Sequence, residues 1–583
     1  MRTIACLLLV VGIAFAHGGS QRSPGSGGIT VVPHGGDPDE PPLSGPKGPA
    51  SSTPGASYTN STWDVWWAQN MEYILAKRRL GVTVTRTRPT RREEPNSQMR
   101  RFVERVRPVA EKAINDSNHS VRAAAYIVLG KLGDKEYLEL LDPKTRIRGE
   151  GWWNAREAAI FAISLLGNPE NRPVLKAIIG DKSRKVRERA IALTGYALDK
   201  DVRSSDDLVW YMRNKHSGIV AVPEAFPHQP EDEFRRYATH LLGFVENADE
   251  VERDLWKALQ GTLKRGPAIQ GLALTALARR EDPDIVEECF RLAYSREADK
   301  AVRRSAAVAL GGVLKPEDGD DIRRLARMIR DRRNDSVQQH FAIMSLGQIG
   351  GKAAIDELLD LARKPVFGAA QDRGFVYLAL GLCAAKSKPA RDFLMAEFRK
   401  VGTPDERASL AMSLGLMRHR DAVPQTIAYL EKSNLASSRK YLAFGCLALG
   451  LQGDPRGVAE VRKVFATFSD VFVRRQAALG LVLLEKDDAV PDLMRVMKKT
   501  GNNATRFAIV TALADLHWPS DAIIDALIKV YQDDSIANVV RAKAMSALGV
   551  LVDPRPIPVS AQLIRLYNYF IRSHALDEVA TWM

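Results

Sequence analysis

The chain has 583 residues, of which 84 are lysine or arginine and 70 are aspartate or glutamate, so its formal charge at pH 7 is +14. This length exceeds the size at which a single compact core usually stops growing, which favours stacked units or several domains. Three cysteines remain beyond residue 16, an odd number at scattered positions that excludes a disulfide framework.

The first 16 residues have the pattern of a secretory signal peptide. Met1 and Arg2 form a short positive end, residues 4–15 are apolar, and residues 14–16 form an A-x-A cleavage site. The apolar run is shorter than the ~20 residues that a transmembrane helix needs. We therefore expect an exported protein, periplasmic or extracellular, without a transmembrane anchor.

A linker and an aromatic segment follow. Residues 17–62 are rich in Gly, Pro and Ser, so we expect a disordered linker there. Residues 63–100 then hold a Trp-rich helix, with Trp63, Trp66 and Trp67, and a basic connector. This helix is either an aromatic anchor for a partner or a sugar, because Trp dominates binding hot spots, or an N-terminal cap on the first helical hairpins, because a solenoid needs covered ends. We favour the cap.

A ten-residue apolar signature recurs in the rest of the chain. It stands at Val121–Gly130, Val302–Gly311 and Val540–Gly549, and each copy is Ala-rich and ends in Leu-Gly. In the central part of the chain, the glycines of successive Leu-Gly pairs lie 34–36 residues apart. This spacing predicts an all-α fold over residues 101–583, an α-α superhelix of about 13 stacked hairpins whose units bury their apolar faces against one another.

Each repeat divides into two helices. Val121, Ala124, Ala125 and Val128 lie at positions i, i+3, i+4 and i+7, one face of the second helix. The glycine after leucine suits a helix end that needs a left-handed residue. We expect the stack to form a curved rod whose concave face displays a binding surface.

Four stretches carry a family resemblance that extends over roughly residues 101–583. They resemble HEAT repeats in the variant shared with PBS-lyase HEAT-like domains, and we expect an exported bacterial type. These stretches are residues 116–134, 181–198, 299–314 and 534–553.

The resemblance implies a ladder between neighbouring repeats, made by an Asp before the second helix and an Arg just inside it. The pairs that fit this pattern are Asp116 with Arg122, Asp181 with Arg187, and Asp534 with Arg541. It also implies two enzymatic alternatives, a lyase that attaches bilins to protein cysteines and a HEAT-like DNA glycosylase.

Basic side chains gather at several places, including Arg184 with Lys185 and Arg323 with Arg324 and Arg327. A basic concave face would attract a polyanion, either an acidic envelope polymer or nucleic acid. Acidic residues are interleaved with these clusters, so charged helix faces that only confer solubility are the alternative. Nucleic acid is the less expected ligand for an exported protein.

Sequence motifs for catalysis are missing: there is no His-Glu-x-x-His, no nucleophile elbow and no phosphate-binding loop. We therefore expect no cofactor and no metal, and a noncatalytic exported scaffold that binds protein partners through the concave face. The candidate partner-binding residues are Trp63, Trp66, Trp67, Arg184, Lys185, Arg323, Arg324 and Arg327. The alternatives are a polyanion-binding module or an enzyme of the two types above.

Overall fold

The computed structural model describes residues 97–553, with gaps of which 213–231 is the longest, and residues 63, 64, 66, 67, 71 and 74. The expected signal peptide, the linker, most of the connector and Lys185 lie outside the described residues. Every regular element in the described part is a helix. None of these helices is both long and apolar enough to cross a bilayer.

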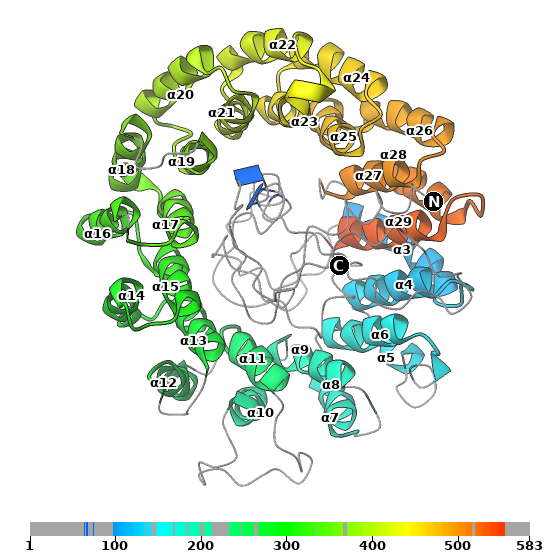
Figure 1. The fold of residues 1–583 in the computed structure, drawn as a ribbon. Coiled ribbons are helices and arrows are strands. Elements are labelled where there is room, and N and C mark those ends of the chain that lie inside the picture. The colour runs from blue at the N-terminus through cyan, green and yellow to red at the C-terminus, as the bar shows by residue number, and fades with distance from the viewer. Residues whose placement is uncertain are drawn as a thin grey trace, which may run out of the picture.

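The helices alternate between an outer and an inner layer (Figure 1). The outer helices are α3 (Ser97–Ala113), α5 (Tyr137–Leu140), α7 (Arg172–Gly180), α10 (Arg203–Met212), α12 (Ala248–Leu259), α14 (Ile285–Tyr294), α16 (Gly319–Arg330), α18 (Gly351–Arg363), α20 (Lys388–Lys400), α22 (Val423–Glu431), α24 (Val458–Thr467), α26 (Val490–Lys499) and α28 (Asp521–Gln532). The inner helices are α4 (His119–Leu132), α6 (Trp153–Leu165), α8 (Val186–Ala192) with α9 (Thr194–Leu198), α11 (Asp232–Leu241), α13 (Pro267–Arg280), α15 (Lys300–Val313), α17 (Ser336–Ile349), α19 (Ala370–Cys383), α21 (Pro404–Leu416), α23 (Leu435–Gln452), α25 (Val471–Glu485), α27 (Asn503–Ala514) and α29 (Asn538–Val552).

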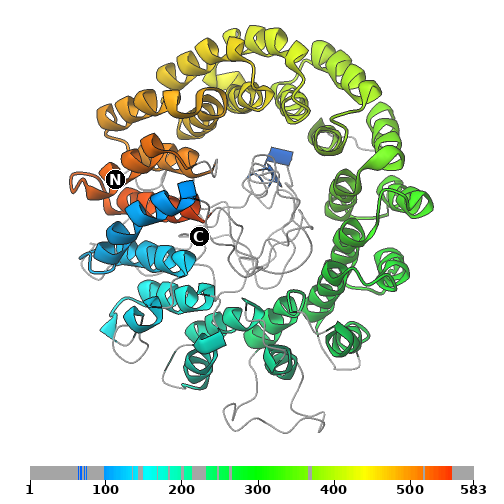
Figure 2. The ribbon, with the colours of Figure 1, turned by 180° about the vertical axis from the view of Figure 1, so that it is seen from behind.

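The stack closes on itself into a ring, which both views show (Figures 1 and 2). The inner helix α29 packs along α4, and the outer helix α28 packs against α3. The expectation of a curved rod is therefore wrong. The ends of the solenoid are buried against each other, so neither end is left as an open apolar face.

The two layers differ in how much of each helix is buried. In α16 only the stripe Ile322, Leu325, Ala326, Met328 and Ile329 is buried, as expected for a helix with one face in solvent. In α4 every residue from Ala123 to Lys131 is buried. Inner helices therefore pack on several sides at once, and their many alanines let the neighbouring helices approach closely.

The glycines of the Leu-Gly signature have another role than the one we predicted. They lie inside the inner helices, and those at positive φ in the described residues are different glycines, such as Gly133 and Gly453, which end α4 and α23. A Cβ added at Gly130 would lie 2.7 Å from Cα of Ala162 in the next inner helix. A side chain at this position would force neighbouring inner helices apart. The glycine of the Leu-Gly pair therefore allows two inner helices to touch and does not end a helix.

Gly415 tests this role, because a Cβ added there would lie 3.0 Å from Cα of Ala448. We expect Gly415→Val to lower the free energy of unfolding by about 1–3 kcal/mol through overpacking. Gly402→Val is the matched control, because a Cβ added at Gly402 meets no atom within 4 Å. Chemical denaturation followed by circular dichroism measures both; equal effects would refute the close-contact role.

Arginines near the start of the inner helices form the ladder that the resemblance implied. Arg122 donates to the backbone carbonyl of Asp116 at 2.8 Å and pairs with the carboxylate of Glu150, in the next repeat, at 2.7 Å. Burial raises the pKa of Glu150, but the hydrogen bonds from Arg122 and from the backbone N–H of Trp152, together with the positive charge of Arg122, outweigh this and the pKa lies below its usual value. The same contact between neighbouring repeats recurs as Arg156 with Glu188 at 2.9 Å.

The ring seam uses this ladder contact again. The Arg541 side chain of α29 pairs with the Asp116 carboxylate at 3.0 Å. Asp116 stands six residues before Arg122, as Glu150 stands six residues before Arg156. A Cβ added at Gly549 would lie 2.9 Å from Cγ2 of Val128, so the glycine contact is repeated as well.

Ion pairs join the outer layer across the seam. In these pairs, Arg101 and Arg105 of α3 contact Asp521, and Arg105 also contacts Asp525 of α28. All of these side chains are partly or largely exposed, so each pair contributes little to stability on its own. The seam therefore depends mainly on the buried contacts between α4 and α29.

Asp116→Ala and Glu150→Ala form a matched pair for testing closure. Each carboxylate also accepts the backbone N–H two residues later, from Asn118 and Trp152. Glu150→Ala removes the carboxylate partner of Arg122 and should cost about 1–3 kcal/mol of unfolding free energy. If the ring is closed in solution, Asp116→Ala should also be destabilising but less so, because Arg541 keeps an ion pair with the exposed Asp534 at 3.1 Å. A silent Asp116→Ala beside a destabilising Glu150→Ala would show an open ring, and small-angle scattering would report the larger dimension.

Candidate functional site

The candidate residues fall into two separate places. Trp63 lies against α19, α21 and α23, and the dark blue fragment inside the ring in Figure 1 marks the segment that holds the three Trp residues. The arginines 323, 324 and 327 lie on α16 in the outer layer (Figure 1). The structure therefore does not combine them into one surface.

Trp63 is seated on the inner wall by contacts with three consecutive inner helices. Its indole ring lies 4.8 Å from the ring of Phe444, centroid to centroid. Its Nε1–H donates to the carboxylate of Asp405 at 3.3 Å. The side chain is fully buried, and burial of an indole contributes roughly 4–6 kcal/mol from apolar area alone.

Gly374 of α19 leaves the space that the indole fills. A Cβ added at Gly374 would overlap Cδ1 of Trp63 and lie 2.8 Å from its Cγ. The three atoms closest to that Cβ all belong to Trp63. We call the site formed by Gly374, Asp405, Lys440 and Phe444 the notch.

A charged group closes one side of the notch. The Lys440 Nζ lies 2.7 Å from the carboxylate of Asp405 and 3.1 Å from that of Asp64. Burial lowers the pKa of Lys440, but the two carboxylates outweigh this and raise it above its usual value. Lys440 therefore stays charged and holds the residue that follows Trp63.

The other apolar residues that the structure describes in the aromatic segment are also buried. Trp66, Trp67, Met71 and Ile74 each expose 3% or less of their surface. Within the described part of the chain the buried Trp67 indole N–H has no hydrogen-bond acceptor, which costs about 1–3 kcal/mol. This segment does dock on its own chain, but not as a cap on the first hairpins: the first hairpin packs against α28 and α29, and Trp63 contacts helices more than 300 residues further on.

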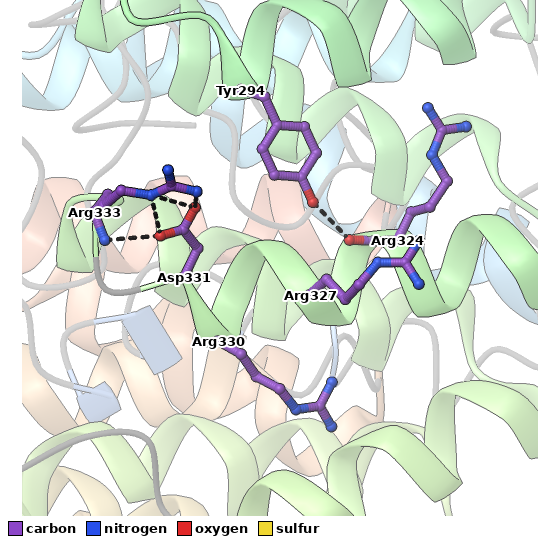
Figure 3. A pocket seen from close by; sticks show the side chains of 6 residues that line it. All are labelled: Tyr294, Arg324, Arg327, Arg330, Asp331 and Arg333. Atoms are coloured by element: carbon purple, nitrogen blue, oxygen red, sulfur yellow. Dashed lines mark hydrogen bonds and ion pairs between the residues drawn. The ribbon is translucent and has the colours of Figure 1, made fainter.

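The arginines of α16 border a shallow hollow of about 500 Å³ on the outer layer (Figure 3). The lining residues are Tyr294, Arg324, Arg327, Arg330, Asp331 and Arg333. Figure 3 shows Arg333 paired with Asp331 on one side, and the Tyr294 hydroxyl donating to the backbone carbonyl of Arg324 on the other, at 3.0 Å.

Most of these arginines have carboxylate partners. Arg324 pairs with Glu287 at 2.6 Å and with Asp321 at 2.8 Å, and the hydrogen bond that it donates to Glu287 raises its pKa. Arg333 donates to Asp331 from its side chain and its backbone, which lowers the pKa of Asp331 to about 2.

The same holds for Arg330, which pairs with Glu357 and Asp360, and for Arg323, which contacts Asp320. Arg327 is the lining arginine with no ion pair among the described residues. The hollow is therefore nearly neutral, although the sequence of α16 is strongly basic.

Arg184 is largely buried and serves the fold. Its side chain is 7% exposed and lies 3.3 Å from the carboxylate of Asp181 and 3.5 Å from that of Glu188. A buried arginine between two carboxylates holds loop and helix together. It offers little surface to a partner.

Of the three free thiols in the described residues, Cys289 and Cys446 are buried and Cys383 is half-buried. Burial raises the pKa of Cys383 to about 12, and it raises the pKa values of Cys289 and Cys446 further. These groups therefore stay protonated near neutral pH. Within the described part of the chain, no three His, Cys, Asp or Glu side chains are grouped so that they could hold a metal.

Comparison with known families identifies the repeat unit. Residues 458–549 match the family of HEAT repeats, and residues 338–364 match the PBS lyase HEAT-like repeat. HEAT-type repeats therefore form these two stretches of the ring. No curated protein matches the chain.

Several solved structures resemble the HEAT ring at low identity. Human deoxyhypusine hydroxylase in complex with glycerol is 17% identical, with 54% of this chain and 96% of that chain covered and a TM-score of 0.20. Yeast importin-beta (Kap95p) is 11% identical, with coverage of 79% and 70% and a TM-score of 0.37. Kap121p bound to Pho4p is 13% identical, with coverage of 76% and 63% and a TM-score of 0.34. These likenesses concern the fold and assign no activity.

Sequence reasoning missed the residues that form the notch in the HEAT ring. Phe444 and Lys440 stand in an apolar inner helix, where the sequence does not distinguish Phe444 from an ordinary core residue. One signal was present: Gly374 is a glycine inside a helix, outside any Leu-Gly pair, and such glycines often mark a close approach of another group.

Substitutions at Arg184 and Arg327 test which arginine stabilises the ring and which is only exposed on it. We expect Arg184→Ala to cost about 1–3 kcal/mol of unfolding free energy, because Glu188 is buried and loses a partner. Arg327→Ala should change it by less than about 0.5 kcal/mol, because the side chain is exposed. Denaturant titration measures both, and the reverse order would overturn the assignment.

Proposed function

We propose that this chain is an exported, noncatalytic scaffold that binds protein partners along the inner wall of a HEAT ring. The observation that supports this function is the notch, where the inner wall receives a tryptophan-bearing segment from outside the repeats. A wall that binds one such segment has the chemistry to bind others.

The ring suits this role because its inner wall is preorganised. The inner helices are held in place by close contacts at glycine and by the arginine ladder. Binding of a partner therefore costs little conformational entropy in the wall. Consecutive inner helices present similar positions side by side, and a partner can therefore make several weak contacts at once.

Binding of a polyanion is less well supported than binding of a protein, because the basic side chains are paired with carboxylates. In the described ring, the arginines of the hollow on α16 are balanced by Glu287, Asp321, Asp331, Glu357 and Asp360. A polyanion would have to displace these carboxylates. No described side-chain arrangement favours the bilin-lyase or DNA-glycosylase alternative over a scaffold.

Export is part of the proposal and rests on residues 1–16. The short positive end, the apolar run and the A-x-A site are the three parts of a cleavable signal peptide. An exported scaffold would start at His17 after cleavage.

Site-specific photocrosslinking in the source cell tests both parts of the proposal. A photoreactive phenylalanine analogue replaces Phe472, which lies 5.5 Å from Phe444 on the inner wall, or Tyr294, which is exposed on the outer layer. We expect adducts with another polypeptide from position 472 in the exported fraction, and none from position 294.

The two parts of the proposal fail separately. Adducts of equal yield at both positions, or none at 472, would contradict binding along the inner wall. A chain found only in the cytoplasm, with residues 1–16 intact by mass spectrometry, would contradict export.

A further inference from the structure

We infer that the notch is a receptor for helical protein segments that carry a tryptophan followed by a carboxylate residue, and that residues 63–74 occupy it as an internal, displaceable ligand. This inference rests on the proposed function and specifies the chemistry of the partner.

The contacts in the notch select that pair of residues. Asp405 accepts the indole N–H, so phenylalanine at the same place would leave this carboxylate without the donor. The absence of a side chain at Gly374 makes room for the indole, and Phe444 packs against it. Lys440 then pairs with the carboxylate of Asp64, the next residue.

The wall of the notch is complete without its occupant. Lys440 keeps its ion pair with Asp405, and α19, α21 and α23 pack on one another through their own contacts. Gly374 is the exception, because the space beside it is filled by Trp63 alone among its nearest atoms. A helix-interior glycine weakens its helix relative to alanine, so the glycine at this position is explained by the contact with Trp63 and not by the needs of α19 itself.

One hydrogen-bond donor of the docked segment lacks an acceptor among the described residues. The Trp67 Nε1–H donates to water when the segment is free but is buried without an acceptor when it is docked. The loss of this hydrogen bond weakens docking. A partner whose segment satisfies all its donors therefore has an advantage in exchange.

Because the internal segment belongs to the same chain, it competes strongly with an external segment for the notch. An internal ligand faces its site at an effective concentration that is commonly millimolar for a short flexible linker. An external segment must displace it, so the notch is closed to weak ligands and open to strong or multivalent ones. Residues 63–74 would thus raise the threshold for binding at this site.

The experiment uses the full chain and a fluorescently labelled synthetic peptide of residues 60–76. Binding is followed by fluorescence anisotropy. We expect the peptide to bind Trp63→Ala protein at least tenfold more tightly than unaltered protein, because the internal competitor is weakened. Gly374→Ala in the Trp63→Ala background should reduce this affinity at least tenfold, because the added methyl group fills the notch.

Controls separate binding from folding. In the Trp63→Ala background, Gly374→Ala should keep or raise the thermal stability of the protein, because alanine favours a helix interior and the atoms nearest to the new methyl group are those of the removed indole. If Trp63→Ala fails to fold, Gly374→Ala alone serves: it should release residues 63–74, which limited proteolysis would then cleave faster than in unaltered protein.

Two results would overturn the inference: equal peptide affinity with and without Gly374→Ala, or no gain in affinity from Trp63→Ala. Either would make residues 63–74 a fixed part of the fold. If crosslinks from position 472 persist in that case, the scaffold function stands with another ligand chemistry. If the peptide binds as expected but those crosslinks are missing, the scaffold function fails and the notch remains.

Discussion

The close approach of neighbouring inner helices is the constraint on which the ring depends. At Gly130, Gly381 and Gly415, an added Cβ would lie 2.7–3.0 Å from the backbone of the next inner helix. Glycine and alanine bring these helices together, while larger side chains separate the outer helices. A layer that is narrow inside and wide outside curves at every step. The curvature of the ring thus follows from side-chain size at a few repeated positions.

Closure follows when this curvature returns the last described repeat to the first. An open solenoid needs terminal repeats with a polar outer face, but α29 is buried from Ala544 to Val552 as an internal helix would be. Arg541 and Gly549 at the seam make the contacts that Arg122 and Gly130 make within the chain. Closure therefore needs no special interface, because the seam is one more repeat contact between residues far apart in sequence.

The sequence carried local information well and long-range information poorly. Periodicity predicted the helical hairpins and the solenoid, because the pattern of apolar residues within one repeat sets those features. It did not predict closure, because the sum of many small rotations decides whether Asp116 meets Arg541. The same limit applies to Trp63: its burial was expected, but its partners Asp405 and Phe444 are more than 340 residues away. The role of glycine was misread, since a Leu-Gly pair suits a helix end and a helix contact equally well.

The charge of the chain also has a different meaning in three dimensions. Arginines dominate the sequence of α16 and the starts of the inner helices, yet Arg122, Arg324 and Arg330 are held by carboxylates. In the sequence, residues 75–96 hold seven basic and two acidic side chains, so this connector carries a sizeable share of the +14 total. It joins the tryptophan segment to α3. The charge counted from the sequence therefore overstates the charge that the described ring offers to a partner, because most of the arginines named above are paired with carboxylates.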